Sequence, residues 1–199
     1  MSVYTTLTLK EVQDFTAPYG LKVIDLIPIQ GGIQNTNYFI VCENRQQYVL
    51  TVFEDMDEQG AGELVPVLEH LGKAGLAVPV PLSHSGKAIH TLKDKPAQVA
   101  PRMQGEHPMP STVGQVQAIA TAQAKIHIAL QGFPLQRTFY RDHAYWRQVS
   151  REIKPNLDVA DTQLLNTLLG LYDALTEMYP NRPKGFIHSD LFRDNTLFE

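Results

Sequence analysis

The sequence predicts an α+β protein of two lobes, in which a β-rich N-terminal lobe precedes a helical C-terminal lobe. Runs of aromatic and β-branched residues, which favour strands, lie mainly in the first half of the chain. Long runs with apolar residues at helical spacing dominate the second half. Between them lies the breaker-rich run of residues 105–110. We therefore expect an N-terminal lobe over residues 1–104 and a C-terminal lobe over residues 105–199.

The N-terminal lobe opens with a predicted short helix over residues 8–16. Thr8 and Glu11 have the spacing of a capping box, and Pro18 with Gly20 ends the helix. The strand-like runs that follow lie at residues 21–29, 36–42 and 47–53. Because their connections are short, we expect an antiparallel sheet.

One main helix and a hairpin complete the predicted N-terminal lobe. Leucine and valine recur at helical spacing after Gly62, and the pair of glycines Gly72 and Gly75 closes this helix. The hairpin is predicted over residues 82–101, with its turn at Ser85–Gly86.

The C-terminal lobe is predicted to contain two long helices. Thr112 can cap the first, which continues to about Leu130. Residues 131–145 are interpreted as a polar loop. The second helix covers residues 161–178, and we expect its leucine stripe to form core.

Composition, charge and cysteine content argue against several classes of protein. Of the 199 residues, 43% are hydrophobic and 19% are charged, as is usual for a globular protein. The net charge of −4 argues against a nucleic-acid partner. No 18-residue apolar run or signal peptide is visible, so we expect no membrane association. The single cysteine, Cys42, indicates a reducing compartment, and we predict a cytoplasmic protein.

The run from His188 to Asn195, His-Ser-Asp-Leu-Phe-Arg-Asp-Asn, has the residues that phosphoryl transfer requires. A carboxylate, here Asp190, can orient an acceptor hydroxyl and take its proton. An amide oxygen five residues later, on Asn195, can bind Mg²⁺, which prefers oxygen ligands. His188 is then a support for the loop backbone.

The same run has two other interpretations. A polar segment after the apolar pair Phe186–Ile187 is compatible with an ordinary turn. A metal hydrolase would need further ligands, and the remaining histidines show no ligand spacing.

A glycine pair, Gly31–Gly32, lies between the first two predicted strands. Glycine allows backbone N–H groups to approach phosphates closely, although such a pair is also typical of a hairpin turn. A glycine turn followed much later by the His188–Asn195 run is the order found in kinases.

The chain resembles the aminoglycoside-phosphotransferase-like kinases and, within them, the bacterial homoserine kinases. The similar runs, spread over most of the chain, are residues 32–39, 48–54, 76–81 and 187–198. The resemblance implies a two-lobed protein-kinase-like fold, with ATP and Mg²⁺ as cosubstrates. It implies phosphorylation of the hydroxyl of L-homoserine in threonine biosynthesis.

The resemblance also implies roles for individual residues. Asp190 would be the catalytic base with His188 beside it, and Asn195 a metal ligand. The implied nucleotide contacts are Gly31, Gly32, Asn35 and Thr36 over the phosphates, and Ala100 and Met103 at the hinge against adenine. Arg141 and Arg193 are candidates for binding an acceptor carboxylate.

Two departures from the family pattern are visible. Thr51 stands where a kinase strand carries a phosphate-binding lysine. The chain stops at Glu199, before the second metal-binding aspartate that the family pattern implies, so we expect an incomplete C-terminal lobe and weak binding of Mg-ATP. Choline, ethanolamine and aminoglycoside kinases remain alternatives, as does a non-catalytic pseudokinase-like module.

Overall fold

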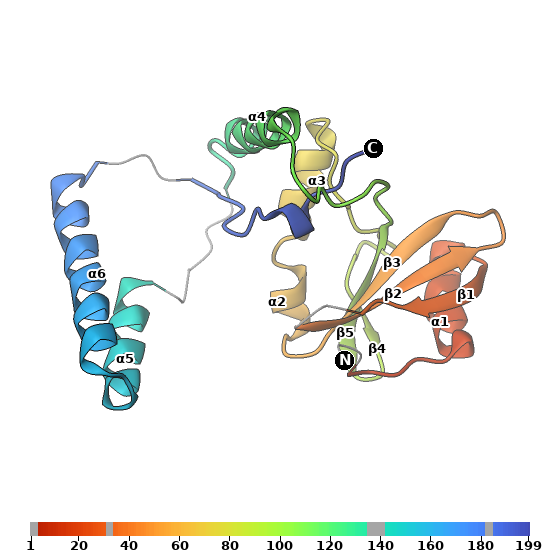
Figure 1. Cartoon of the computed structure of the whole chain (residues 1–199). Coiled ribbons are helices and arrows are strands. Elements are labelled where there is room, and N and C mark those ends of the chain that lie inside the picture. Colours follow the sequence, from red (N-terminus) through yellow and green to blue (C-terminus); the bar gives the residue numbers. More distant parts are fainter. Residues whose placement is uncertain (1–3, 31–33, 135–141, 182–184) are drawn as a thin grey trace. The chain divides into compact units, whose positions relative to one another are not determined.

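The computed structural model describes residues 4–30, 34–134, 142–181 and 185–199 (Figure 1). The chain forms two compact units, Met1–Phe133 with Phe186–Glu199, and Pro134–Gly185. We describe each unit by itself. The lobe boundary between residues 104 and 105 remains a prediction.

The larger unit is built on a five-stranded antiparallel sheet. Its strands are β1 (Val23–Pro28), β2 (Asn35–Cys42), β3 (Gln47–Phe53), β4 (His90–Leu92) and β5 (Lys95–Pro101). They are arranged in the order β1-β2-β3-β5-β4. The predicted antiparallel meander of the first three strands is confirmed.

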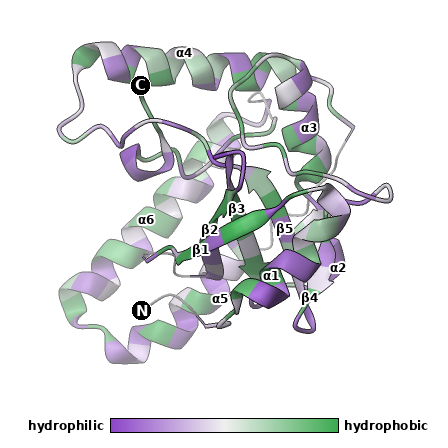
Figure 2. Cartoon of the chain, turned by 90° about the vertical axis from the view of Figure 1, so that its right-hand side faces the viewer, coloured by the Kyte–Doolittle hydropathy of each residue, from purple (hydrophilic) through white to green (hydrophobic). Residues whose placement is uncertain are grey.

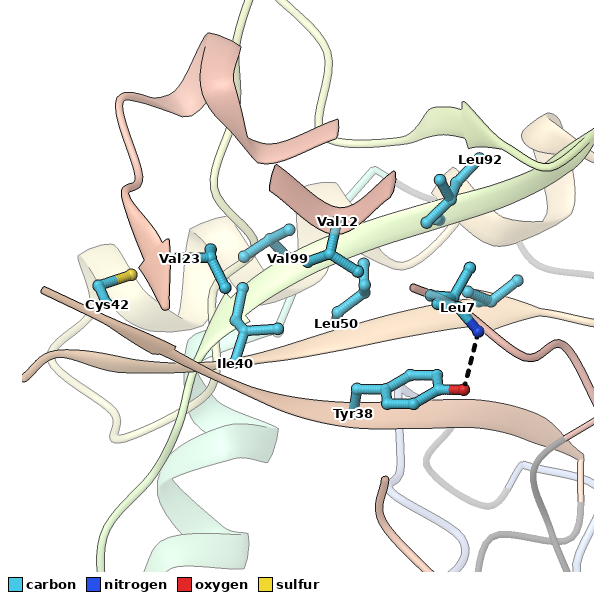
Figure 3. Close-up of a cluster of buried hydrophobic side chains, with 11 residues drawn as sticks. Leu7, Val12, Val23, Tyr38, Ile40, Cys42, Leu50, Leu92 and Val99 are labelled. Carbon is cyan, nitrogen blue, oxygen red and sulfur yellow. Dashed lines mark hydrogen bonds between the residues drawn. The ribbon is translucent and has the colours of Figure 1, made fainter. Parts of the chain in front are cut away.

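Helix α1 (Leu9–Thr16) lies against one face of this sheet (Figure 1). The capping box between Thr8 and Glu11 forms as predicted, and Gly20, with φ of 73°, follows the helical turn Ala17–Tyr19. Val12 of α1 packs among side chains from all five strands, which form the core shown in Figure 3.

Side chains of β2 alternate strictly between the two faces of the sheet. Thr36, Tyr38, Ile40 and Cys42 are buried on the face toward α1, whereas the residues between them are half-buried. Directly paired residues of antiparallel strands share a face, so the register carries this division across β3 and β5. We call the face opposite α1 the open face.

The predicted helix that starts near Gly62 is confirmed as α3 (Val65–Lys73), which begins after Leu64. Pro66 lies in the first turn of α3, where its missing N–H costs nothing. A short helix that was not predicted, α2 (Glu58–Gly62), precedes it and is capped by Asp57.

The predicted hairpin over residues 82–101 turns at a different place. Strands β4 and β5 are joined at Lys93–Asp94, whose φ angles of 49° and 61° are those of a tight hairpin turn. Ser85 and Gly86 form a smaller turn that bridges His84 and Lys87. The prediction chose the glycine-containing turn and missed the two left-handed non-glycine residues.

Helix α4 (Val113–Ala129) belongs to the larger unit and forms as predicted, with a capping box between Thr112 and Gln115. Its end is joined to α3, because the ring of His70 bonds the carbonyl of Ala129 at 2.8 Å.

The smaller unit contains α5 (His143–Ile153), the turn Lys154–Asn156 and α6 (Val159–Met178). The start of α5 corrects the predicted loop over residues 131–145: Asp142 caps it by accepting a bond from the amide of Tyr145 at 2.9 Å. The two helices meet through polar and aromatic groups, with His143 and Arg147 bonded to Asp173.

The leucine stripe of α6, predicted as core, is not buried in this unit. Hydrophobic segments recur along α6 (Figure 2), and Leu164, Leu168 and Leu171 are more than half exposed. No helix of the described residues is long and apolar enough to cross a membrane.

Candidate active site

The segment after Phe186 (dark blue in Figure 1) forms a loop that brings Asp190 and Asn195 together. The loop bends at Ser189, whose φ of 68° is left-handed, and turns again in the single helical turn Arg193–Asn195. Asn195 donates from Nδ2 to the carbonyl of Asp190 at 2.7 Å and to its carboxylate Oδ2 at 3.0 Å. The carboxylate is exposed but held in place.

The same bonds determine how the Asn195 amide faces. Both acceptors belong to Asp190, so the nitrogen must point toward them and Oδ1 away. Oδ1 makes no hydrogen bond to any described residue. An exposed neutral oxygen of this kind is a suitable ligand for a hard divalent cation.

The loop is attached to the segment that follows β5. Glu106 exchanges two backbone hydrogen bonds with Phe198, at 2.8 and 3.0 Å. His107 bonds the carbonyl of Thr196 through Nδ1 at 2.9 Å. Gly105 makes the close approach possible: its φ is 113°, and a Cβ there would lie 2.8 Å from the carbonyl oxygen of Phe198.

The open face of the sheet carries two rows of side chains that cross the strands. The first, which we call the apolar row, consists of Ile27, Phe39, Val49 and Ala100, paired strand to strand. The guanidinium of Arg102 lies 3.8 Å above the ring of Phe39 and donates to Gln47 at 2.8 Å. The apolar row thus crosses four strands and ends on β5, next to the segment that holds Arg102.

The second row is offset from the first by two residues on β2, β3 and β5, toward the end of β2 that carries Asn35. It consists of Asn37, Thr51 and Gln98, again paired strand to strand, and we call it the polar row. Thr51 donates from Oγ1 to Oδ1 of Asn37 at 2.8 Å.

Thr36 faces the other way. It is fully buried on the α1 face, where its hydroxyl accepts from the amides of Tyr4 and Thr5 and donates to Glu54 at 2.5 Å. Lys95 bonds the same carboxylate. Burial raises the pKa of Glu54, but the bonds from its partners outweigh this and leave the pKa below its usual value.

Comparison with known proteins gives a family match over most of the chain. Residues 25–199 match the profile of a family described as the phosphotransferase enzyme family. The chain belongs to this phosphotransferase family.

Curated relatives include two bacterial homoserine kinases. The chain is 31% identical to the homoserine kinase of Janthinobacterium sp. (strain Marseille), with 100% of the chain covering 62% of that relative. It is 32% identical to the homoserine kinase of Cupriavidus metallidurans (strain ATCC 43123 / DSM 2839 / NBRC 102507 / CH34), with 100% and 63% covered. The chain thus spans less than two thirds of the length of these relatives.

Solved structures show the same fold at low identity. Spectinomycin phosphotransferase APH(9)-Ia, in complex with ADP and spectinomycin, superposes with a TM-score of 0.70 at 16% identity, covering 98% of this chain and 66% of that one. Amicoumacin kinase hAmiN, with AMP-PNP and Ca²⁺, gives 0.67 at 14% identity, covering 97% and 61%. The predicted protein-kinase-like α+β fold is confirmed.

The phosphotransferase site residues predicted from sequence fall into three groups. The structure brings Asp190 and Asn195 together and sets Ala100 in the apolar row. Asn35 lies on the open face and Met103 just beyond β5, whereas the Thr36 hydroxyl is turned away toward Glu54. Gly31, Gly32 and Arg141 lie outside the described residues.

His188 does not support the loop in the way its motif position suggests. It is exposed and makes no hydrogen bond to a described residue. The loop is bonded by His107 instead, a residue that sequence reasoning missed. In the sequence, His107 could have been noticed only by its position two residues after Gly105, in the run predicted to connect the lobes.

A hollow of about 550 Å³ lies at the end of the β2–β3 hairpin, lined by Arg45, Gln46, Gln47, Tyr48, Leu82, Pro101 and Gln104. It contains none of the predicted site residues. No group of three or more histidine, cysteine, aspartate or glutamate side chains that could hold a metal ion occurs among the described residues.

Proposed function

We propose that this chain carries the nucleotide-binding and catalytic-loop parts of an ATP-dependent kinase whose acceptor is the hydroxyl of L-homoserine. The product would be O-phospho-L-homoserine, a step of threonine biosynthesis, and the enzyme would act in the cytoplasm. One observation carries the proposal: Asn195 holds the exposed Asp190 carboxylate while its own oxygen is left free.

The proposed phosphoryl transfer involves ATP, the acceptor hydroxyl, Asp190 and Asn195. The acceptor oxygen forms a bond to the γ-phosphorus of ATP, and the bond to the β,γ-bridging oxygen breaks, so that ADP leaves with the electron pair. Asp190 orients the acceptor hydroxyl and accepts its proton. Asn195 keeps the carboxylate in that position through its two hydrogen bonds.

Mg²⁺ is the cation that this site would hold. The fit rests on Asn195 Oδ1, an oxygen without a partner among the described residues, next to a carboxylate. When bound, the ion would neutralise charge that develops on the phosphates.

The nucleotide would lie along the open face. The apolar row would receive the base beside Ala100 and Met103, and in the sequence the glycine pair 31–32 precedes the end of β2 that carries Asn35. The homoserine assignment rests on the curated relatives, which are homoserine kinases at 31–32% identity. Arg193, exposed in the loop, is our candidate for the carboxylate of the acceptor.

The test is phosphoryl transfer by the 199-residue chain, measured as acceptor-dependent formation of ADP. We expect homoserine to stimulate it, and Asp190→Asn to lower the rate by about 10²–10⁴, the usual contribution of a catalytic base. ADP binding should survive in this variant. Transfer to choline or an aminoglycoside instead would overturn the homoserine assignment. Nucleotide binding without transfer to any acceptor would make the chain a binding module.

A further inference from the structure

We propose that the polar row is a neutral phosphate-contacting site, in which Asn37 and Gln98 donate to the phosphates of the nucleotide and Thr51 positions Asn37. The proposal rests on the proposed function, because it assigns the part of the nucleotide that this row contacts. Three features of the row support it: its place on the sheet, its free donors and its lack of charge.

The place follows from the strand register. Asn37, Thr51 and Gln98 lie two residues from Phe39, Val49 and Ala100 on β2, β3 and β5. Two residues of antiparallel strand span about 7 Å. A nucleotide with its base on the apolar row therefore extends its phosphates over the polar row, toward the end of β2 that follows residues 31–32.

The donors follow from the hydrogen bonds. The Thr51 hydroxyl donates to Asn37 Oδ1, which turns the Asn37 amide nitrogen outward. This nitrogen has two hydrogens and makes one long bond, to the carbonyl of Asn35 at 3.3 Å. The side chain of Gln98 makes no hydrogen bond to a described residue. Phosphate oxygens only accept, so these N–H groups match them.

Thr51 has a different role from its neighbours. Its one proton is already used on Asn37, so it offers no donor to a phosphate. Its effect is to prevent the Asn37 amide from rotating and presenting oxygen to the anion. Thr51 is therefore a positioning residue.

No cation takes part in the row itself. Lys95 begins β5, but its ammonium bonds Glu54 and Thr5 and is bound to the carboxylate on the α1 side. Introducing a negative charge into the row should therefore weaken phosphate binding strongly, because Lys95, the cation at the start of β5, is already paired with Glu54.

The experiment compares ADP with adenosine, which lacks the phosphates, by calorimetry on the 199-residue chain. Asn37→Asp keeps the shape but presents a negative charge, and we expect ADP to bind about 10–100-fold more weakly while adenosine binding stays unchanged, as loss of a bond to a charged group implies. Thr51→Val should weaken ADP alone, by roughly 3–10-fold. Thr51→Ser should restore it. Thr91→Val, the same change at an exposed position of β4, is the matched control and should alter neither ligand.

The outcomes separate the two proposals. If the unmodified chain binds neither adenosine nor ADP, the proposed function fails. If it binds both and Asn37→Asp leaves their affinity ratio unchanged, the phosphate-contacting row is overturned. Equal loss of both ligands in Thr51→Val would make Thr51 a structural residue, which contradicts the positioning role.

Discussion

Asn195 bonds Asp190 twice across five residues, once at the backbone carbonyl and once at the carboxylate, at 2.7 and 3.0 Å. The two bonds close the loop on itself. They also mean that the carboxylate is already oriented without a substrate, so in the proposed function little reorganisation would be needed at the transition state.

Asn195→Ala removes both bonds and the free Oδ1. We expect Mg²⁺ to strengthen ADP binding in the unmodified chain and to have less than about a third of that effect in the variant, since one oxygen ligand is lost. Titrating ADP with and without Mg²⁺ measures this. Asn166→Ala, at an exposed position of α6, should leave the Mg²⁺ effect intact. An unchanged effect in Asn195→Ala would remove Asn195 from the metal site.

Gly105→Ala should detach the loop from the segment after β5. The added Cβ meets backbone atoms of Phe198 at 2.8 to 3.0 Å, and the φ of 113° is unfavourable for alanine. We expect a loss of about 1–3 kcal/mol in unfolding free energy and faster amide exchange at Glu106 and Phe198.

The matched control for this change is Gly114→Ala in α4, where a Cβ meets nothing within 4 Å. It should be neutral or stabilise by up to about 1 kcal/mol. Equal effects of the two alanines would show that the Gly105 contact does not hold the loop.

Glu54→Gln tests the buried cluster that holds the N-terminal segment to the sheet. The pKa of Glu54 is lowered in the folded chain, so its contribution is present above about pH 4.3, the unfolded value, and is lost as pH falls through the lower folded value. At pH 7 we expect a loss of about 1–3 kcal/mol, because charged hydrogen bonds are replaced by weaker ones.

Denaturation from pH 7 to pH 3 should then show a smaller acid-induced loss of stability in Glu54→Gln than in the unmodified chain. Glu58→Gln, which breaks the exposed pair with Lys87, should change stability by less than about 0.5 kcal/mol. If the stability of Glu54→Gln falls with pH in parallel with that of the unmodified chain, the lowered pKa of Glu54 does not contribute to stability.

Tyr38→Phe removes one buried hydroxyl from the core. This hydroxyl donates to the carbonyl of Thr5 at 3.0 Å and accepts from the amide of Leu7 at 3.2 Å, the bond drawn in Figure 3. The variant strands a buried N–H, so we expect a loss of about 1–2 kcal/mol by thermal or chemical unfolding.

Tyr48→Phe is the control, since the exposed Gln46 side chain is the one hydrogen-bond partner of the Tyr48 hydroxyl among the described residues. It should cost less than about 0.5 kcal/mol. Equal losses of unfolding free energy in the two variants would show that the hydrogen bonds of the Tyr38 hydroxyl to the N-terminal segment do not stabilise the fold.

Local patterns predicted the elements whose causes are local. The capping boxes at Thr8 and Thr112 each need only four residues, and both formed as expected. The aromatic and β-branched residues of β2 predicted a strand, and short connections predicted antiparallel pairing. The hairpin turn at Lys93–Asp94 was missed because its left-handed residues are not glycines.

The Asp190–Asn195 pair could be predicted as a site because both residues lie on one loop, five positions apart. The polar row could not, since its members come from positions 37, 51 and 98 and meet only through strand register. The bond from His107 to Thr196 likewise joins residues 89 positions apart.

Short-range pattern and motif order were enough to predict the family and the α+β arrangement, both of which are confirmed. They also predicted residues 188–195 as the catalytic loop, which stays a prediction. Which side chains lie on the open face of the sheet depends on tertiary structure. Thr36 and Asn37 are neighbours in the chain, yet one is sealed against Glu54 and the other faces the open side. Strand geometry sends successive side chains to opposite faces, and only the packing of α1 against one face determines which of the two is open.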